Sequence, residues 1–164
     1  MQTLTDEKIE MLTQKANDIR QSIIKMLVEA GSGHTAGPLG MADIFTALFF
    51  YIMHHDPLNL TWKNRDRLIL SNGHICPVLY ATMAHAGYIP VEELQTLRKF
   101  GSKLQGHPHR EYFSALETSS GPLGSGLSQA VGMALADRLD NGNKSSVFFY
   151  TMLGDGELNE GQVW

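Results

Sequence analysis

The sequence has little cysteine: its 164 residues include a single one, Cys76. One thiol cannot form an internal disulfide and has no second sulfur beside it for a zinc site, so a disulfide-stapled scaffold is excluded. Because Cys76 stands directly before Pro77 in an apolar segment, we expect it to serve in packing. Such thiol usage is compatible with a reducing compartment.

Excess positive charge and long apolar runs are also absent. The 13 Lys and Arg residues face 17 Asp and Glu residues, a net charge of -4, and no dense basic run indicates nucleic acid as a partner. The N-terminus lacks the basic start and apolar stretch of a signal peptide, and the most apolar window, residues 44–53, is too short to span a bilayer. We therefore expect a cytoplasmic protein with neither nucleic acid nor membrane as a partner.

The chain does contain clear periodic patterns. Apolar residues recur every three or four positions from Thr5, which can cap a helix, to Gly31, which can end it. Helical periods also occur at residues 41–53, 76–86, 91–100 and 125–139. Residues 67–71 and 146–153 are strand-like, and the second segment is apolar on both faces, as in a sheet that is covered on both sides.

This alternation predicts an α/β fold, a doubly wound parallel sheet with flanking helices, in which ligands bind where strands end and helices begin. An apolar content of 43% is enough for the core of one domain. With two clear strands only, and with the chain stopping at Trp164 where the next helix should start, we expect residues 1–164 to form a single partial domain, incomplete at the C-terminus.

Three histidines lie in three separate glycine-bearing loops: His34, His74 and His107. His74 follows a predicted strand and precedes a helical segment, a favourable position for an anion. Imidazoles presented in this way suit a polyhydroxylated substrate that exchanges protons. The alternatives are a flexible connection around His34, a capping or core role for His74, and a surface turn at His107.

Two further loops have both structural and ligand-binding interpretations. Gly106-His-Pro-His109 could supply two zinc ligands, but the other histidines are scattered, which favours a turn. The segment 119–126, Ser-Ser-Gly-Pro-Leu-Gly-Ser-Gly, opens the helix that begins at Ser125 and could offer backbone N–H groups to a ligand. It lacks the Gly-x-Gly-x-x-Gly spacing of a dinucleotide-binding fold.

An acidic residue, Asp155, follows the strongest strand, between Gly154 and Gly156. Its carboxylate would repel a pyrophosphate bound at the next helix unless a divalent cation joined the two groups. Mg²⁺ and Ca²⁺ prefer carboxylate, carbonyl and phosphate oxygens. The sequence therefore indicates Asp155 as a metal ligand, with a simple Asp-Gly turn as the alternative.

Five motifs occur together and in order. They are Gly31-Ser-Gly-His34, Arg65-Asp-Arg-Leu-Ile-Leu-Ser-Asn-Gly-His74, Leu104-Gln-Gly-His107-Pro, Gly121-Pro-Leu-Gly124 and Gly154-Asp-Gly-Glu-Leu-Asn-Glu-Gly161. With this combination the chain resembles the N-terminal, thiamine-diphosphate-binding section of transketolases over nearly its whole length. Residues 87–105 resemble in particular the separate N-terminal subunits of two-subunit transketolases.

The resemblance implies an enzyme that uses thiamine diphosphate and Mg²⁺ (or Ca²⁺) to move a two-carbon ketol unit from a ketose phosphate to an aldose phosphate. The cofactor is the electron sink, and the protein positions the reactants. The resemblance further implies that His34 and His107 contact substrate hydroxyls and assist proton transfer, and that Asp155 binds the metal. The residues that it implies for cofactor binding are His74, Gly121, Pro122, Leu123 and Gly156.

The resemblance also implies a partner, namely a C-terminal transketolase subunit or domain within a homodimer or heterotetramer, with Glu160 towards the dimer interface. Thr35 stands where a Pro usually follows the first histidine, which leaves that loop less rigid, and His109 replaces an acidic residue. Three groups of the family have no counterpart before Trp164: an Asn that completes the metal site, a further substrate histidine, and the glutamate that activates the aminopyrimidine ring.

Three alternatives stay open. The first is a truncated, non-catalytic fragment or assembly subunit that lacks complete cofactor binding. The second is another thiamine diphosphate enzyme, which would share the Gly-Asp-Gly turn but not the three histidine loops. The third, a nicotinamide enzyme, ranks lowest because no dinucleotide fingerprint follows a strand.

Overall fold

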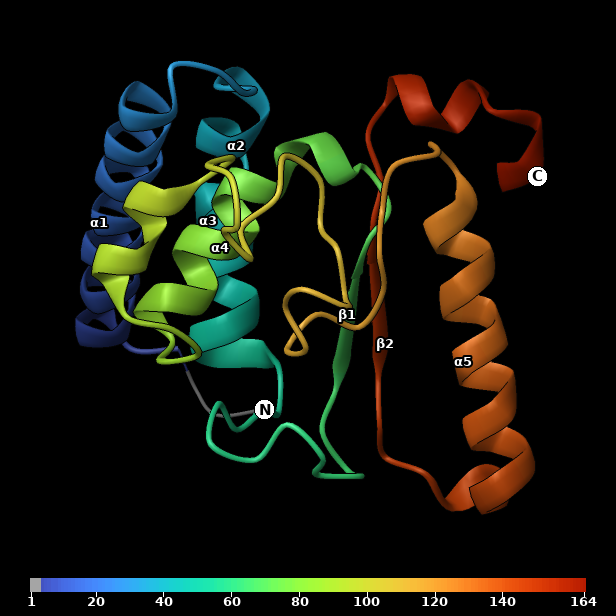
Figure 1. Cartoon of the computed structure of the whole chain (residues 1–164). Coiled ribbons are helices and arrows are strands. Elements are labelled where there is room, and N and C mark those ends of the chain that lie inside the picture. The colour runs from blue at the N-terminus through green and yellow to red at the C-terminus, as the bar shows by residue number, and fades with distance from the viewer. Residues whose placement is uncertain (1–3) are drawn as a thin grey trace.

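The computed structural model of the chain describes residues 4–164. It confirms the α/β fold: two parallel strands stand between a group of helices on one side and a single long helix on the other (Figure 1). The helices and strands, in chain order, are α1 (Asp6–Ala30), α2 (Ala36–Gly40), α3 (Ala42–Ala47), β1 (Arg67–Leu70), α4 (Cys76–His85), α5 (Ser125–Asn141) and β2 (Phe149–Met152). Short π and 3₁₀ helices are η1 (Leu48–Ile52), η2 (Gly73–Ile75), η3 (Val91–Thr96), η4 (Gly142–Lys144), η5 (Gly156–Asn159) and η6 (Gly161–Val163).

Helix α1 begins and ends where the sequence predicts. The Thr5 hydroxyl accepts a hydrogen bond from the Lys8 amide at 3.3 Å. Gly31 adopts φ 63°, a conformation that favours glycine, and its N–H donates to the carbonyls of Leu27 and Val28. Local capping and one apolar face therefore account for this helix, and the residues buried on that face are Ala16, Ile19, Ile23, Met26 and Leu27.

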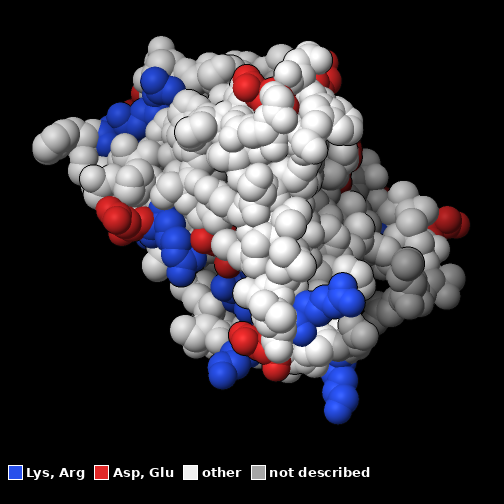
Figure 2. All heavy atoms as spheres, turned by 90° about the vertical axis from the view of Figure 1, so that its right-hand side faces the viewer, with Lys and Arg blue, Asp and Glu red and all other residues white. Residues whose placement is uncertain are grey.

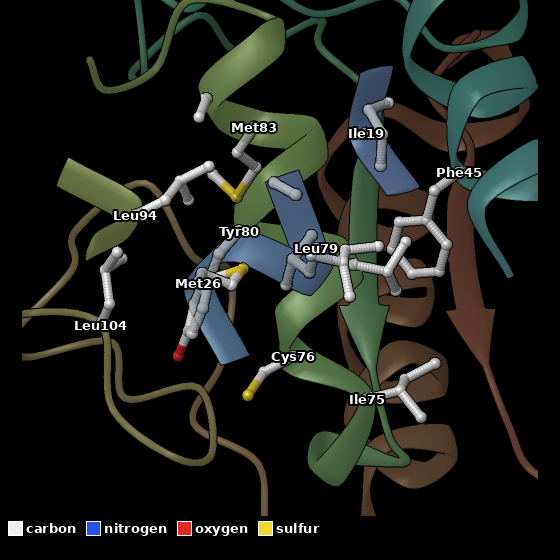
Figure 3. Close-up of a cluster of buried hydrophobic side chains, with 14 of the residues drawn as sticks. Ile19, Met26, Phe45, Ile75, Cys76, Leu79, Tyr80, Met83, Leu94 and Leu104 are labelled. Carbon is white, nitrogen blue, oxygen red and sulfur yellow. The ribbon is translucent and has the colours of Figure 1, made fainter. Parts of the chain in front are cut away.

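Helix α4 is the centre of the hydrophobic core. Every residue from 76 to 84 is buried, so the helix is covered on all sides. Figure 3 shows Met26 of α1 and Phe45 of α3 in the same cluster as Leu79 and Tyr80 of α4. Cys76 is 1% exposed, which confirms its packing role, and burial raises the pKa of its thiol to about 12.

The two strands run parallel, with Arg67 opposite Phe149 and Leu70 opposite Met152. Asp66 links the segments that precede the two strands. Its carboxylate, 2% exposed, accepts the backbone N–H of His54 and that of Phe148, both at 2.8 Å. One buried side chain thus joins the segment before β1 to the segment before β2 through two hydrogen bonds.

Strand β2 is shorter and less buried than predicted. The sequence predicts a fully covered strand over residues 146–153, but β2 has four residues, and all of them are half-buried. Within residues 4–164 this strand pairs only with β1, so one of its edges lacks a neighbour. An apolar sequence predicts burial, but burial also needs a neighbouring element on each side.

Helix α5 covers the face of the sheet opposite to the other helices (Figure 1). Its inner side is buried at Gly126 and Ala130. Its outer side exposes Val131, Leu135 and Leu139, by 50%, 55% and 86%. Figure 2 shows the side of the molecule that lies on the right in Figure 1, where α5 is found. This surface is mostly uncharged, with a few Lys, Arg, Asp and Glu side chains interspersed.

Two predicted helices differ from the structure. Residues 41–53 form the short α3 followed by the π-helical η1. The helix predicted at 91–100 is wrong: η3 ends at Thr96, and the chain reverses at Arg98, which has φ 61° and donates its N–H to the carbonyl of Leu104 at 2.8 Å. Within residues 4–164, no helix combines the length and the apolar character that a membrane span needs.

Candidate active site

Three glycine-bearing loops meet at the carboxyl ends of β1 and β2, and the carboxylate of Glu157 holds them together. The hydroxyl of Ser71 donates to Oε1 of Glu157 at 2.5 Å. The Gly124 N–H donates to the same oxygen at 2.6 Å, and the Gly154 N–H donates to Oε2 at 2.9 Å. Glu157 is 2% exposed, so these donors replace the water that it loses.

A backbone N–H group at the start of α5 also has its hydrogen-bond acceptor within the protein. Ser71 Oγ accepts the Gly126 N–H at 3.0 Å, and a Cβ built on Gly126 would lie 2.5 Å from the Cβ of Ser71. Only a glycine allows α5 to approach β1 so closely. The prediction that this loop offers its N–H groups to a ligand is therefore wrong for Gly124 and Gly126, because Glu157 and Ser71 already accept from them.

The three histidines predicted from separate loops lie close together. The ring centroids of His34 and His74 are 4.9 Å apart. A Cβ built on Gly73, next to His74, would lie 3.1 Å from Cδ2 of His107. His74 is half-buried, whereas His34 and His107 are exposed. The fold therefore groups three imidazoles from residues that are far apart in the sequence.

Burial and neighbouring charges lower the pKa of two of these imidazoles, His74 and His107. Burial lowers the pKa of His74, the neighbouring His34 lowers it further, and Glu157 opposes the shift. Burial also lowers the pKa of His107, with further contributions from His74, His34 and Arg98. A neutral imidazole can accept a proton, and a lowered pKa favours the neutral form, so His74 and His107 are suited to general base catalysis.

Sequence reasoning missed two residues of this site. The sequence shows Glu157 only as part of a motif, and its contacts with Ser71 and Gly124 arise from the fold. The helical period at 91–100 predicts Arg98 in a helix, whereas in the structure Arg98 lines the same crevice as His34, His74 and Gly106. The one local signal for Arg98 is Gly106, whose missing side chain admits the guanidinium: a Cβ built there would lie 2.9 Å from Nη1 of Arg98.

The residues predicted for cofactor and metal lie around these loops. Gly121, Pro122 and Leu123 precede α5, and Gly156 opens η5 directly after the exposed Asp155. Among residues 4–164 no group of three or more His, Cys, Asp or Glu side chains could hold a metal ion, so Asp155 has no such group around it.

A second oxygen of suitable chemistry lies next to that turn. Asn72 is 4% exposed, and its Oδ1 has no hydrogen-bond partner among the described residues. Its Nδ2 lies 3.6 Å from a Cβ built on Gly154. A carboxylate and an unpartnered amide oxygen fit a hard cation and its bound water, although they do not complete a coordination shell.

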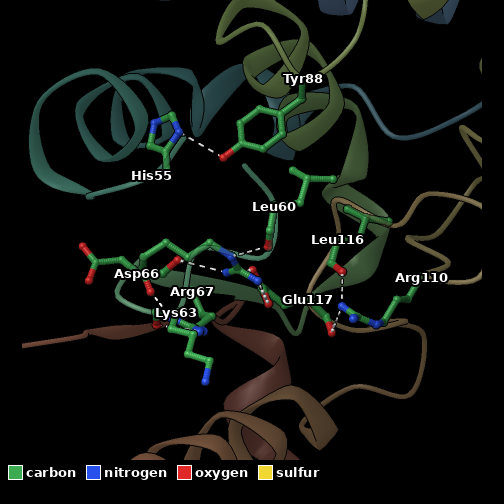
Figure 4. A network of polar contacts seen from close by, with 10 residues as sticks. His55, Leu60, Lys63, Asp66, Arg67, Tyr88, Arg110, Leu116 and Glu117 are labelled. Carbon is green, nitrogen blue, oxygen red and sulfur yellow. Dashed lines mark hydrogen bonds and ion pairs between the residues drawn. The ribbon is translucent and has the colours of Figure 1, made fainter. Parts of the chain in front are cut away.

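A different cavity, near the beginning of β1, is lined by paired polar groups. Tyr88 donates to or accepts from Nδ1 of His55 at 3.0 Å, and Arg65 forms an ion pair with Glu117 (Figure 4). Arg65 Nε also donates to the carbonyl of Leu60 at 2.8 Å. Because these groups bind one another, we interpret this network as structural.

Comparisons with known proteins agree with this geometry. Residues 11–163 match the family described as transketolase, thiamine diphosphate binding domain. Transketolase from Mus musculus is 42% identical over 159 residues, which cover 96% of this chain and 25% of that protein. The 6-deoxy-6-sulfo-D-fructose transketolase subunit SqwG from Clostridium sp. (strain MSTE9) is 40% identical over 161 residues, covering 98% of this chain and 57% of that protein.

Solved structures show the same similarity. Transketolase from Leishmania mexicana superposes with a TM-score of 0.86 at 34% identity, over 93% of this chain and 24% of that one. A Pichia stipitis transketolase in complex with sedoheptulose 7-phosphate gives 0.88 at 38% identity. The chain thus spans between a quarter and about half of the length of these curated relatives. By motif, fold and site, it belongs to the transketolase family and corresponds to the thiamine-diphosphate-binding domain of its members.

Proposed function

We propose that this chain is the cofactor-binding component of a transketolase of carbohydrate metabolism. In the assembled enzyme, thiamine diphosphate with Mg²⁺ (or Ca²⁺) would serve the transfer of a two-carbon ketol unit between sugar phosphates, in the cytoplasm and within the pentose phosphate pathway. The observation that carries the proposal is the meeting of three glycine loops and three histidines at the carboxyl ends of two parallel strands. Ligand sites of such sheets lie at that edge.

The cofactor supplies an electron sink when it is bound. We propose that His74, Gly121, Pro122, Leu123 and Gly156 hold it and that Asp155 binds its cation. The N–H groups of Gly124 and Gly154 already donate to Glu157, so we do not propose them as cofactor contacts. The role of Glu157 is indirect, because its hydrogen bonds fix the positions of the loops that carry the contacting residues.

His34 and His107 are proposed to bind substrate hydroxyls and to move protons. Both are exposed to solvent at the histidine cluster, so a sugar can reach them. The lowered pKa of His107 favours the neutral ring, whose unprotonated nitrogen can accept a proton from a hydroxyl, whereas both nitrogens of a charged ring are already protonated.

A partner would supply what these residues lack. We propose a C-terminal transketolase subunit or domain, in a homodimer or heterotetramer, that contributes the glutamate that activates the aminopyrimidine ring, with Glu160 near the interface. The apolar outer face of α5 supports assembly with another chain, as does the name of the Clostridium relative, which is a transketolase subunit. Residues 1–164 would then act as a single partial domain, of which residues 1–3 lie outside the described part.

A second candidate is a non-catalytic fragment or assembly subunit. It is favoured by the absence, among residues 4–164, of any group of three or more His, Cys, Asp or Glu side chains that could hold a metal ion. Both candidates predict the same fold, but only the first predicts cofactor binding at Asp155.

Calorimetric titration with thiamine diphosphate and Mg²⁺ separates the two candidates. The chain is titrated alone and after addition of a C-terminal transketolase subunit, with Asp155→Ala as the test variant. Asp140→Ala, an exposed acid at the far end of α5, is the matched control. Binding that strengthens with the partner and is lost only in Asp155→Ala supports the enzyme component. Absence of binding under both conditions supports the non-catalytic candidate.

A further inference from the structure

The position of His107 depends on backbone anchors on both sides of it. Its own side chain is exposed, so the core does not enclose the ring. On the C-terminal side, the carbonyl of Pro108 accepts the N–H of Ser120 at 3.0 Å. On the N-terminal side, the carbonyls of Gln105 and Gly106 accept hydrogen bonds from helix α4. These anchors therefore determine where the imidazole lies.

Two side chains of α4 supply the anchors that precede His107. The Tyr80 hydroxyl donates to the carbonyl of Gln105 at 3.0 Å, and the Cys76 thiol donates to the carbonyl of Gly106 at 3.2 Å. Residues four positions apart share one face of a helix, and Figure 3 shows both groups on the same side of α4. Burial raises the pKa of each group, so both remain protonated donors near neutral pH.

Of these two donors, Tyr80 is the stronger one, because a thiol forms only weak hydrogen bonds. Tyr80 is 0% exposed, at a depth where a hydroxyl without an acceptor would cost free energy. A phenylalanine would fill the same space, so packing alone does not require the hydroxyl. Its contact with Gln105 joins the best-buried helix of the core to the loop that carries His107.

We propose that Tyr80 is a positioning residue for His107: its hydroxyl holds the carbonyl of Gln105 and thereby keeps the imidazole within the histidine cluster. The catalytic consequence rests on the proposed function, in which His107 binds a substrate hydroxyl and moves a proton. The placement itself rests on hydrogen bonds within this chain. A displacement of about 1 Å at a reacting group can cost about a hundredfold in rate, so a rigid support for this loop matters to the reaction.

The test compares two Tyr→Phe variants, each of which loses one hydrogen-bonded hydroxyl and keeps its ring. Tyr80→Phe is the test variant. Tyr88→Phe is the matched control, because the Tyr88 hydroxyl is hydrogen-bonded to His55 at 3.0 Å in the cavity near the beginning of β1. The ring signals of the three clustered histidines are titrated with pH by nuclear magnetic resonance in the chain without cofactor. Thermal unfolding verifies that both variants are folded.

A selective change at His107 is the expected result. In Tyr80→Phe its titration midpoint should rise towards 6.5, because a released loop reduces the burial of the ring and its proximity to neighbouring charges. The midpoint of His74 should stay the same, since burial and His34 lower its pKa. Tyr88→Phe should leave both midpoints unchanged. A general loss of stability would not separate His107 from His74, so the selective shift reports positioning.

Two further measurements address the hydrogen bond and its effect on the reaction. In the unmodified chain, the hydroxyl proton of Tyr80 should give a slowly exchanging signal, because it is buried and hydrogen-bonded. In complex with a C-terminal transketolase subunit, Tyr80→Phe should lower kcat/KM by about tenfold or more, while the Kd of thiamine diphosphate changes by less than about twofold.

The inference would be overturned by a His107 midpoint that is unchanged in Tyr80→Phe, by an equal shift of His74, by an equal shift in Tyr88→Phe, or by rapid exchange of the Tyr80 hydroxyl proton. Failure of the proposed function gives a different pattern. If thiamine diphosphate does not bind but the His107 midpoint still shifts in Tyr80→Phe alone, the positioning role stands without the enzyme assignment. If the cofactor binds through Asp155 and Tyr80→Phe transfers the ketol unit as fast as the unmodified chain, the enzyme assignment stands without the positioning role.

Discussion

Ser71 and Glu157 are 86 positions apart in the chain, yet the hydroxyl of one donates to the carboxylate of the other at 2.5 Å. Ser71 follows β1, and Glu157 lies in η5 after β2, so this hydrogen bond joins the ends of the two strands. The same carboxylate also accepts the N–H groups of Gly124 and Gly154. The geometry of the site therefore depends on a single buried anion.

Replacing Glu157 with Gln keeps the shape of the side chain but turns an NH₂ group towards one of its N–H donors. We expect the free energy of unfolding to fall by about 2–3 kcal/mol, since a buried donor is left without an acceptor. Urea unfolding measures the effect. Glu160→Gln, three positions later and exposed, is the control and should change stability by less than about 0.5 kcal/mol. Equal effects of the two variants would contradict the structural role of Glu157.

Replacing two glycines of α5 with alanine should change the free energy of unfolding in opposite directions. Gly126→Ala places a Cβ 2.5 Å from that of Ser71, so we expect a loss of about 2 kcal/mol from overpacking. Gly132→Ala meets nothing within 4 Å and should stabilise the helix by about 0.5–1 kcal/mol. Thermal unfolding of both variants measures the contrast. The close approach of α5 to β1 would be refuted by a neutral or stabilising Gly126→Ala.

The lowered pKa values of His74 and His107 make stability depend on pH. Each group binds fewer protons in the folded chain than in the unfolded chain, where its pKa is near 6.5. Their contribution is therefore fully present above pH 6.5 and is lost as pH falls through that value towards the folded pKa. Histidine titration by nuclear magnetic resonance should give midpoints below 6.5, and Arg98→Ala should raise that of His107. A midpoint of His107 at or above 6.5 in the unmodified chain would refute the prediction.

Asp66→Asn should loosen the beginnings of both strands. The carboxylate accepts the N–H groups of His54 and Phe148, and an amide retains one acceptor oxygen for two donors. We expect a loss of about 2 kcal/mol and faster hydrogen exchange at the Phe148 amide. Asp56→Asn, a half-buried acid that accepts the N–H of Leu58 in a turn, is the control. Unchanged exchange at Phe148 would show that Asp66 does not hold the strands.

Much of the local structure could be predicted from neighbouring residues. Thr5, Gly31 and the apolar face between them define α1, because capping and helical periodicity depend on residues that are close in the chain. The strand at Arg67–Leu70 and the helix at Ser125–Asn141 follow from patterns of the same kind. The motifs were enough to predict the family, and the histidine loops named the three imidazoles that the fold brings close together.

The tertiary structure decided what no local pattern carries. The burial of β2 depends on whether a second strand lies beside it, and within residues 4–164 none does. The reversal at Arg98 is maintained by Leu104 and Gly106, so a helical period at 91–100 could not exclude it. In the sequence nothing distinguishes Glu157 from other acidic residues. Its role follows from the fold, which brings Ser71 and Gly124 within hydrogen-bond distance of it. Sequence alone determined the positions of α1, α4, α5 and β1 and the family, because those follow from periodicity and motif. The hydrogen-bond partners of Glu157 and the grouping of the three histidines followed from contacts between residues that the fold brings together from distant positions.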